Sequence, residues 1–175
     1  ASGSTAQGGI AYPWATVGTS AGTPTDYAFF NNGFVVAAGT SSVNNTATSW
    51  TSGSNPVVNS TTFSLLTASA TANTVRYIGG TGTMALGAYQ LQTRGILQIG
   101  SGALTITGSS LTTPAGIGSL FLTSNASNTT VSGTITDAPG GGAVTLVASG
   151  PGTLTLSSGS NFYSGGTVIN GGGLV

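Results

Sequence analysis

Residues 150–175, GPGTLTLSSGSNFYSGGTVINGGGLV, alternate short apolar runs with glycine-rich corners. Leu154 and Leu156 fall on one face of an extended strand, and the threonines between them fall on the other face. The glycine clusters 165–166 and 171–173 separate this strand from two further short strands, 167–169 and 174–175. Strands and glycine corners in this order are typical of a coil of a parallel β-solenoid.

Apolar pairs spaced two residues apart recur along the chain from residue 66 onward. One series has a glycine before each pair and spacings of 23 and 24 residues between pairs: Leu97/Ile99, Leu120/Leu122 and Val144/Leu146. A second series comprises Leu104/Ile106, Val131 with Ile135, and Leu154/Leu156. We therefore expect an all-β parallel β-helix without helices, with these aliphatic side chains inside and threonines such as Thr105 outside. About seven stacked coils would accommodate the chain.

Residues 1–65 lack this regularity and hold most of the aromatic side chains. We expect this region to be an irregular cap or the first coils, followed by regular coils over residues 66–175. Aromatic side chains here are expected to fill the core of a tapering end. An alternative is that Trp and Tyr rings are exposed and stack against sugars.

The carboxyl-terminal stretch resembles the autotransporter-associated β-strand repeat of bacterial surface proteins. The resemblance covers residues 150–175, with weaker echoes upstream, and rests on these positions of the repeat motif: Gly152, Leu154, Leu156, Asn161, Tyr163, Gly165, Gly166 and Asn170. It implies a right-handed parallel β-helix that is exported to the bacterial cell surface or secreted. It implies no reaction.

Composition excludes several function classes. The chain of 175 residues has only two basic and two acidic residues, with no His and no Cys. Two cations give no electrostatic footprint for nucleic acid, and no apolar run is long enough to span a membrane. Without His, Cys or a pair of neighbouring carboxylates we expect no catalytic site, metal or cofactor. The chain begins at Ala1 rather than Met, so we expect a processed or excised segment.

Two hypotheses for function remain. In the first, the protein is a structural subunit that stacks head to tail with copies of itself, or with adjacent repeats, into an extracellular fibre or coat. Near-zero net charge favours such self-association, and an open coil end offers unpaired strand groups. The expected assembly interface comprises Tyr12, Trp14, Ile169, Leu174 and Val175. The alternative is a surface adhesin or glycan-binding module that uses the amino-terminal aromatic residues.

Overall fold

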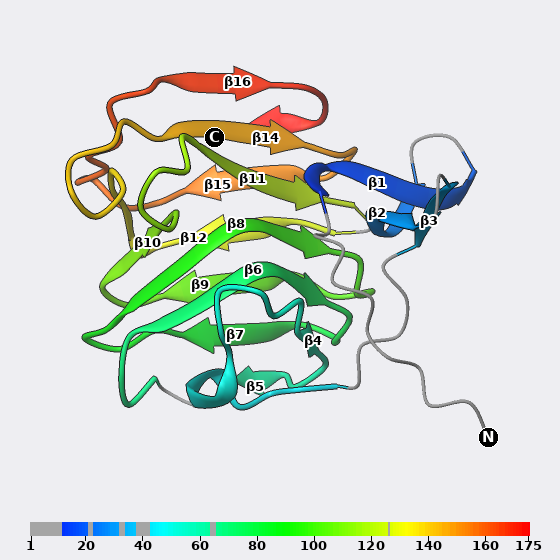
Figure 1. Ribbon diagram of the computed structural model, residues 1–175, viewed down its shortest axis with the longest axis horizontal. Coiled ribbons are helices and arrows are strands. Elements are labelled where there is room, and N and C mark those ends of the chain that lie inside the picture. The colour runs from blue at the N-terminus through cyan, green and yellow to red at the C-terminus, as the bar shows by residue number, and fades with distance from the viewer. Residues whose placement is uncertain (1–11, 21–22, 32–33, 38–42, 64–65, 126) are drawn as a thin grey trace.

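The protein folds into a stack of parallel β-coils with a small antiparallel sheet on its side (Figure 1). The computed structural model describes residues 12–20, 23–31, 34–37, 43–63, 66–125 and 127–175. These residues contain no α-helix and one short 3-10 helix, η1 (Ala47–Ser49). The coils make a β-solenoid of about 5 turns. The predicted all-β parallel solenoid is confirmed, with fewer coils than the seven expected.

Two long parallel sheets run the length of the stack. We call the first sheet one; its main column is β4 (Val57–Val58), β6 (Ala70–Tyr77), β8 (Gln90–Gln98), β11 (Ser119–Ser124), β14 (Thr145–Ser149) and β16 (Thr167–Ile169). A side column begins at the first half of β8, which pairs with β10 (Ser110–Thr112). β10 in turn pairs with β13 (Thr134–Ile135). Sheet two comprises β5 (Thr62–Phe63), β7 (Gly82–Ala85), β9 (Leu104–Thr107), β12 (Thr129–Val131), β15 (Thr153–Leu156) and β17 (Gly173–Leu174).

The interior between these sheets is an almost purely aliphatic core. In sheet two, Ile106 pairs with Val131, and Val131 pairs with Leu156. Their neighbours on the outer face, Thr105 and Thr130, also pair with each other and are half-buried. The alternation of aliphatic residues inside and threonines outside is therefore confirmed in this sheet. Ile135, assigned to the same series, lies instead in the side column, where β13 pairs with β10.

The column predicted from Leu97, Leu120 and Val144 is wrong. Leu120 pairs with Leu146, and Leu97 pairs with Thr123. Leu97 points outward and is buried against Tyr27 rather than in the solenoid core. The physical reason is that the coils differ in length, because loops before β11 and β14 add residues at the corners without disturbing the stacked strands. A constant repeat read along the chain therefore shifts out of register.

The amino-terminal part of the chain forms an antiparallel sheet of three strands, β1 (Tyr12–Ser20), β2 (Thr23–Asn31) and β3 (Phe34–Ala37). We call β1 and β2 the ribbon. The ribbon lies beside the coils at the level of β8 and β11, not over either end of the stack (Figure 1). The following segment, with η1 and the buried Trp50, packs against β6 and joins the solenoid core.

Candidate binding site

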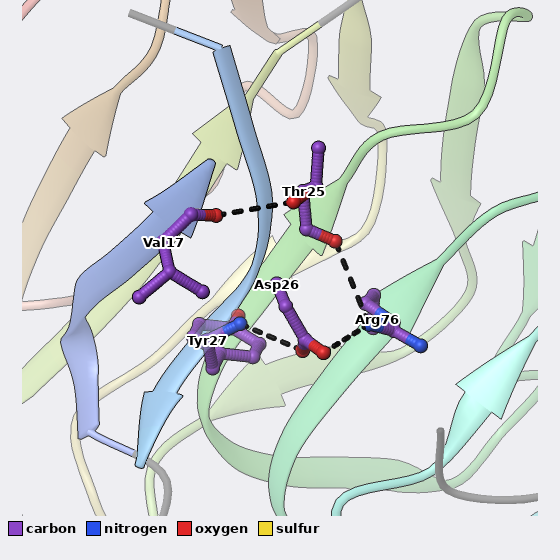
Figure 2. Close-up of polar contacts among 5 residues, drawn as sticks. All are labelled: Val17, Thr25, Asp26, Tyr27 and Arg76. Carbon is purple, nitrogen blue, oxygen red and sulfur yellow. Dashed lines mark hydrogen bonds and ion pairs between the residues drawn. The ribbon is translucent and has the colours of Figure 1, made fainter. Parts of the chain in front are cut away.

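A buried ion pair joins the ribbon to the coils. The Oδ2 atom of Asp26 in β2 lies 2.5 Å from the Nη1 atom of Arg76 in β6, and both side chains are largely shielded from solvent. Arg76 also reaches the carbonyl oxygen of Thr25 at 3.5 Å, and the Asp26 carboxylate accepts the backbone N–H of Tyr27 at 2.8 Å. Figure 2 shows these contacts, with Asp26 pointing from the ribbon toward the guanidinium group. A carboxylate and a guanidinium buried together hold this part of the ribbon in one position, since separating them would leave a buried charge without its partner.

Apolar contact completes the junction. Tyr27 and Leu97 are both buried and pack together, with Ile99 beside them. Burial, together with the nearby Asp26 charge, raises the pKa of the Tyr27 hydroxyl well above 10.0. Gly95 lies under the ribbon, where a Cβ would come within 3.1 Å of both Pro13 and the Tyr27 hydroxyl. The missing side chain allows the ribbon to approach the sheet this closely.

A groove opens where the ribbon ends and sheet one continues. Its floor is made by outward residues of successive coils: Phe121 and Thr123 from β11, and Ser149 from β14, which pairs with Thr123. The lining also includes Asn170 with the glycines that follow it, and Trp14 of the ribbon, which is 64% exposed. The groove has a volume of about 660 Å³, and none of the residues lining it is charged.

A smaller hollow of about 240 Å³ adjoins this groove. Both are lined by Pro13, Trp14 and Phe121. Arg94 lines the smaller hollow together with residues 116–119. Trp14 thus borders two adjoining concave surfaces rather than one.

The residues predicted to form an assembly interface lie in two separate places. Trp14 is on the ribbon at the side of the stack, and the side chain of Tyr12 lies outside the described residues. Ile169 and Val175 are exposed in the last coil, and Leu174 is partly buried against the core. Within one chain, Trp14 shares the groove with Asn170 of that coil, although it does not cover the end of the stack.

Most of the repeat-motif residues have structural contacts. Leu154 lies in the core, and Leu156 and Tyr163 pack against it. Asn161 accepts the backbone N–H of Ile135 at 2.9 Å, which ties one coil to the next. Three of these glycines are demanded by geometry. A Cβ at Gly165 would lie 2.6 Å from the Val144 backbone, and Gly166 has a φ of +82°. A Cβ at Gly152 would likewise meet the Ser127 carbonyl oxygen, at 2.5 Å.

The other aspartate, Asp137, is held in a separate polar cluster. Its carboxylate accepts the backbone N–H groups of Ser164 and Val144 at 2.8 and 2.9 Å, and the Ser164 hydroxyl at 2.7 Å. These hydrogen bonds lower the pKa of Asp137. Asp137 shares none of these partners with Asp26, and the described residues contain no cluster of acidic, His or Cys side chains that could hold a metal ion. No helix among them is long and apolar enough to cross a membrane.

Sequence reasoning did not identify the floor of the groove. The available signal was Phe121, an aromatic residue at the outward position between two inward leucines of β11. It also did not pair Asp26 with Arg76, although a chain with two acidic and two basic residues offers few alternatives. The groove could not be located from sequence because the position of the ribbon depends on contacts between distant segments.

Comparison with known proteins identifies one segment. Residues 146–175 match the family described as Passenger-associated-transport-repeat, so the predicted resemblance to an autotransporter passenger repeat is confirmed for this segment. The match begins inside β14 and includes β15, β16 and β17. No curated protein and no solved structure matches the chain significantly.

Proposed function

We propose that the chain is a non-catalytic, structural part of a bacterial surface or secreted passenger, and that its last coil receives a further coil in a longer β-helical rod. The β-solenoid fold and the matched passenger repeat at residues 146–175 support the passenger-like character. The description of that family, which refers to passenger transport, also supports export of the chain from the cell. Asp26 forms an ion pair with Arg76, and Asp137 accepts a hydrogen bond from Ser164. The use of both aspartates in structural contacts supports the non-catalytic role.

The observation that carries the proposal is the exposed end of the core at the last coil. Ile169 pairs with the core residue Ala148, yet it is 55% exposed. β16 pairs with β14, and β17 pairs with β15, so each has one edge without a strand partner among the described residues. An apolar column ending beside two open strand edges is a template for another strand.

The opposite end of the stack differs. There, Ala47 and Trp50 are buried and belong to the core cluster, so the segment around η1 covers the first coils. This difference favours a coil-forming repeat over the amino-terminal end of a second copy as the partner of β16 and β17, because a covered core has little apolar surface left to share.

Adding a coil tests the proposal. A second copy of residues 150–175, joined after Val175, should fold onto the open end, raise the melting temperature and resist proteolysis. Ile169→Lys in the first copy should abolish this protection, because it places a charge on the core column beneath the new coil. Val168→Lys is the matched control: Val168 neighbours Ile169 in β16 and is 44% exposed, but it pairs with the outward residue Val147.

An added coil that remains sensitive to protease, or equal loss of protection in both lysine variants, would contradict the proposal. Electron microscopy of the native surface assembly provides a second readout. Rods that extend beyond a single 175-residue unit are expected, and globular particles of single-unit size would argue against a continuous rod.

A further inference from the structure

We propose that the groove between the ribbon and sheet one binds a neutral oligosaccharide, with Trp14 as its stacking surface. This inference concerns the side of the stack and does not depend on what covers its end. A neutral sugar presents an apolar C–H face and a rim of hydroxyl groups, and the groove offers an aromatic wall together with hydroxyl and amide side chains.

The aromatic component comes from two different segments. Trp14 projects from β1 with 64% of its surface exposed, and Phe121 lies half-buried in the floor. An indole ring supplies a large, rigid apolar surface with a polar N–H at its edge, a combination suited to a partner that is itself half apolar and half polar. Both hollows adjoin Trp14, but Arg94 lines the smaller one, so the proposed neutral sugar lies in the larger groove, whose lining carries no charge.

The polar component comes from Thr123 and Ser149 in the floor and from Asn170. Thr123 is buried and pairs with Ser149 on the next coil, so two hydroxyl-bearing residues follow one another at the spacing of adjacent strands. Asn170, at the next corner, adds an amide that both donates and accepts hydrogen bonds. Together they can bind several hydroxyl groups of a ligand without any ionic contact.

Charge and size narrow the class of ligand. The larger groove has no charged lining residue, so an acidic sugar entering it would lose hydration without gaining a cation. Its floor is the face of a sheet rather than an edge, which leaves no row of free backbone groups for an extended peptide. A volume of about 660 Å³ falls in the range of small-ligand sites.

The groove is also formed before any ligand arrives. The Asp26–Arg76 pair and a hydrogen bond of 2.8 Å from Asn125 to the Pro24 carbonyl oxygen hold the ribbon against the coils. Trp14 therefore does not have to be ordered by the sugar through movement of the ribbon, which reduces the entropic cost of binding.

The test is a titration of the full chain with neutral hexasaccharides of glucose, xylose, mannose, galactose and N-acetylglucosamine, alongside an acidic galacturonate hexamer. Binding is followed by calorimetry and by tryptophan fluorescence, which reports on exposed Trp14 and buried Trp50. We expect saturable binding of at least one neutral sugar and weaker binding of the acidic one. Trp14→Ala should weaken the neutral interaction by at least about tenfold.

Two further variants make the result specific. Thr123→Val keeps the side-chain volume and removes the hydroxyl, and should weaken binding by roughly three- to tenfold. Phe34→Ala removes an aromatic side chain that is 71% exposed on β3 but does not line either hollow, and should leave affinity unchanged. Circular dichroism confirms that each variant is folded.

Three outcomes would overturn the proposal: no neutral sugar binds saturably, the acidic hexamer binds more tightly than every neutral one, or Phe34→Ala weakens binding as much as Trp14→Ala. If Trp14→Ala unfolds the ribbon, the affinity of Thr123→Val provides the test, because Thr123 lies in β11 and not in the ribbon. In that case unchanged affinity in Thr123→Val overturns the proposal.

Discussion

Ile96 and Leu97 are neighbours in β8 and are both almost fully buried, but different parts of the molecule bury them. Ile96 faces the solenoid core, where coils close in sequence stack on one another. Leu97 faces outward and is covered by Tyr27 of the ribbon, 70 residues earlier in the chain. The first environment arises from repetition along the chain, whereas the second exists only because a distant segment packs onto the side of the stack. The two environments should therefore respond differently to mutation.

The largest effect is expected in the core. Leu120 is fully buried there, so Leu120→Ala should lower the free energy of unfolding by about 2–5 kcal/mol through lost burial and a residual cavity. Thr105→Ala, on the outer face of sheet two, should cost less than about 1 kcal/mol. Urea unfolding of both variants measures the difference. Similar losses at the two positions would contradict the inward and outward assignments.

The ribbon junction should be the next most sensitive. Asp26→Asn removes the partner of a largely buried Arg76 and should cost about 2–3 kcal/mol, a figure reduced for the partial exposure of the pair. The loss should appear as faster hydrogen exchange in β1 and β2, with exchange in the coils unchanged. The double variant Asp26→Asn, Arg76→Met should recover part of the loss, because no buried charge remains. Faster exchange throughout the coils would show that the two regions unfold together.

Coil corners should tolerate added volume poorly. A Cβ at Gly100 would lie 1.9 Å from the carbonyl oxygen of Gly79 in the preceding coil, so Gly100→Ala must push the coils apart. The expected cost is about 1–3 kcal/mol. A Cβ at Gly159 would meet no atom within 4 Å. Gly159→Ala therefore provides the matched control in thermal unfolding. A harmless Gly100→Ala would mean that the coil spacing is adjustable.

The smallest effects concern pH. Hydrogen bonds from Ser164 and Val144 lower the pKa of Asp137 below 3.8, so the folded state binds this proton less readily than the unfolded state. Stability from Asp137 is therefore present above pH 3.8 and is lost as the pH falls through the lowered value. Asp137→Asn should lower the melting temperature at pH 7, and its difference from the unmutated protein should narrow in acid. A difference that is constant down to the lowest pH would contradict this assignment.

At alkaline pH the ribbon junction should respond. The pKa of Tyr27 is raised above 10.0, so the unfolded state releases this proton first and stability should fall as the pH rises beyond 10.0. With few other titrating groups, we expect a nearly constant melting temperature from about pH 4 to 9. Tyr27→Phe should reduce the alkaline loss without abolishing it, because burial also raises the pKa of Tyr77 in the solenoid core. An alkaline loss of the same size in Tyr27→Phe as in the unmutated protein would contradict the contribution assigned to Tyr27.

The candidate site was predicted only in part. Trp14 was recognised as an aromatic residue that could contact a sugar, because its ring type and neutral surroundings are visible in the sequence. Phe121, Thr123 and Ser149 were not connected with it, since they come from coils more than a hundred residues further along the chain. The burial of Leu97 on the outer face was not predicted for the same reason, since Tyr27, which covers it, comes from a distant segment.

The sequence by itself determined that the chain is all-β, that its strands stack as parallel coils, and that its carboxyl-terminal coil is a passenger-type repeat. The alternation of apolar and polar residues and the glycine corners act over a few residues, so the local sequence of each coil specifies its strands and turns. Only the tertiary structure decided the register between coils and the position of the ribbon. Loops of unequal length leave the strand pattern intact while shifting which residues pair, and a single ion pair with a small apolar contact has no periodicity that a sequence could display.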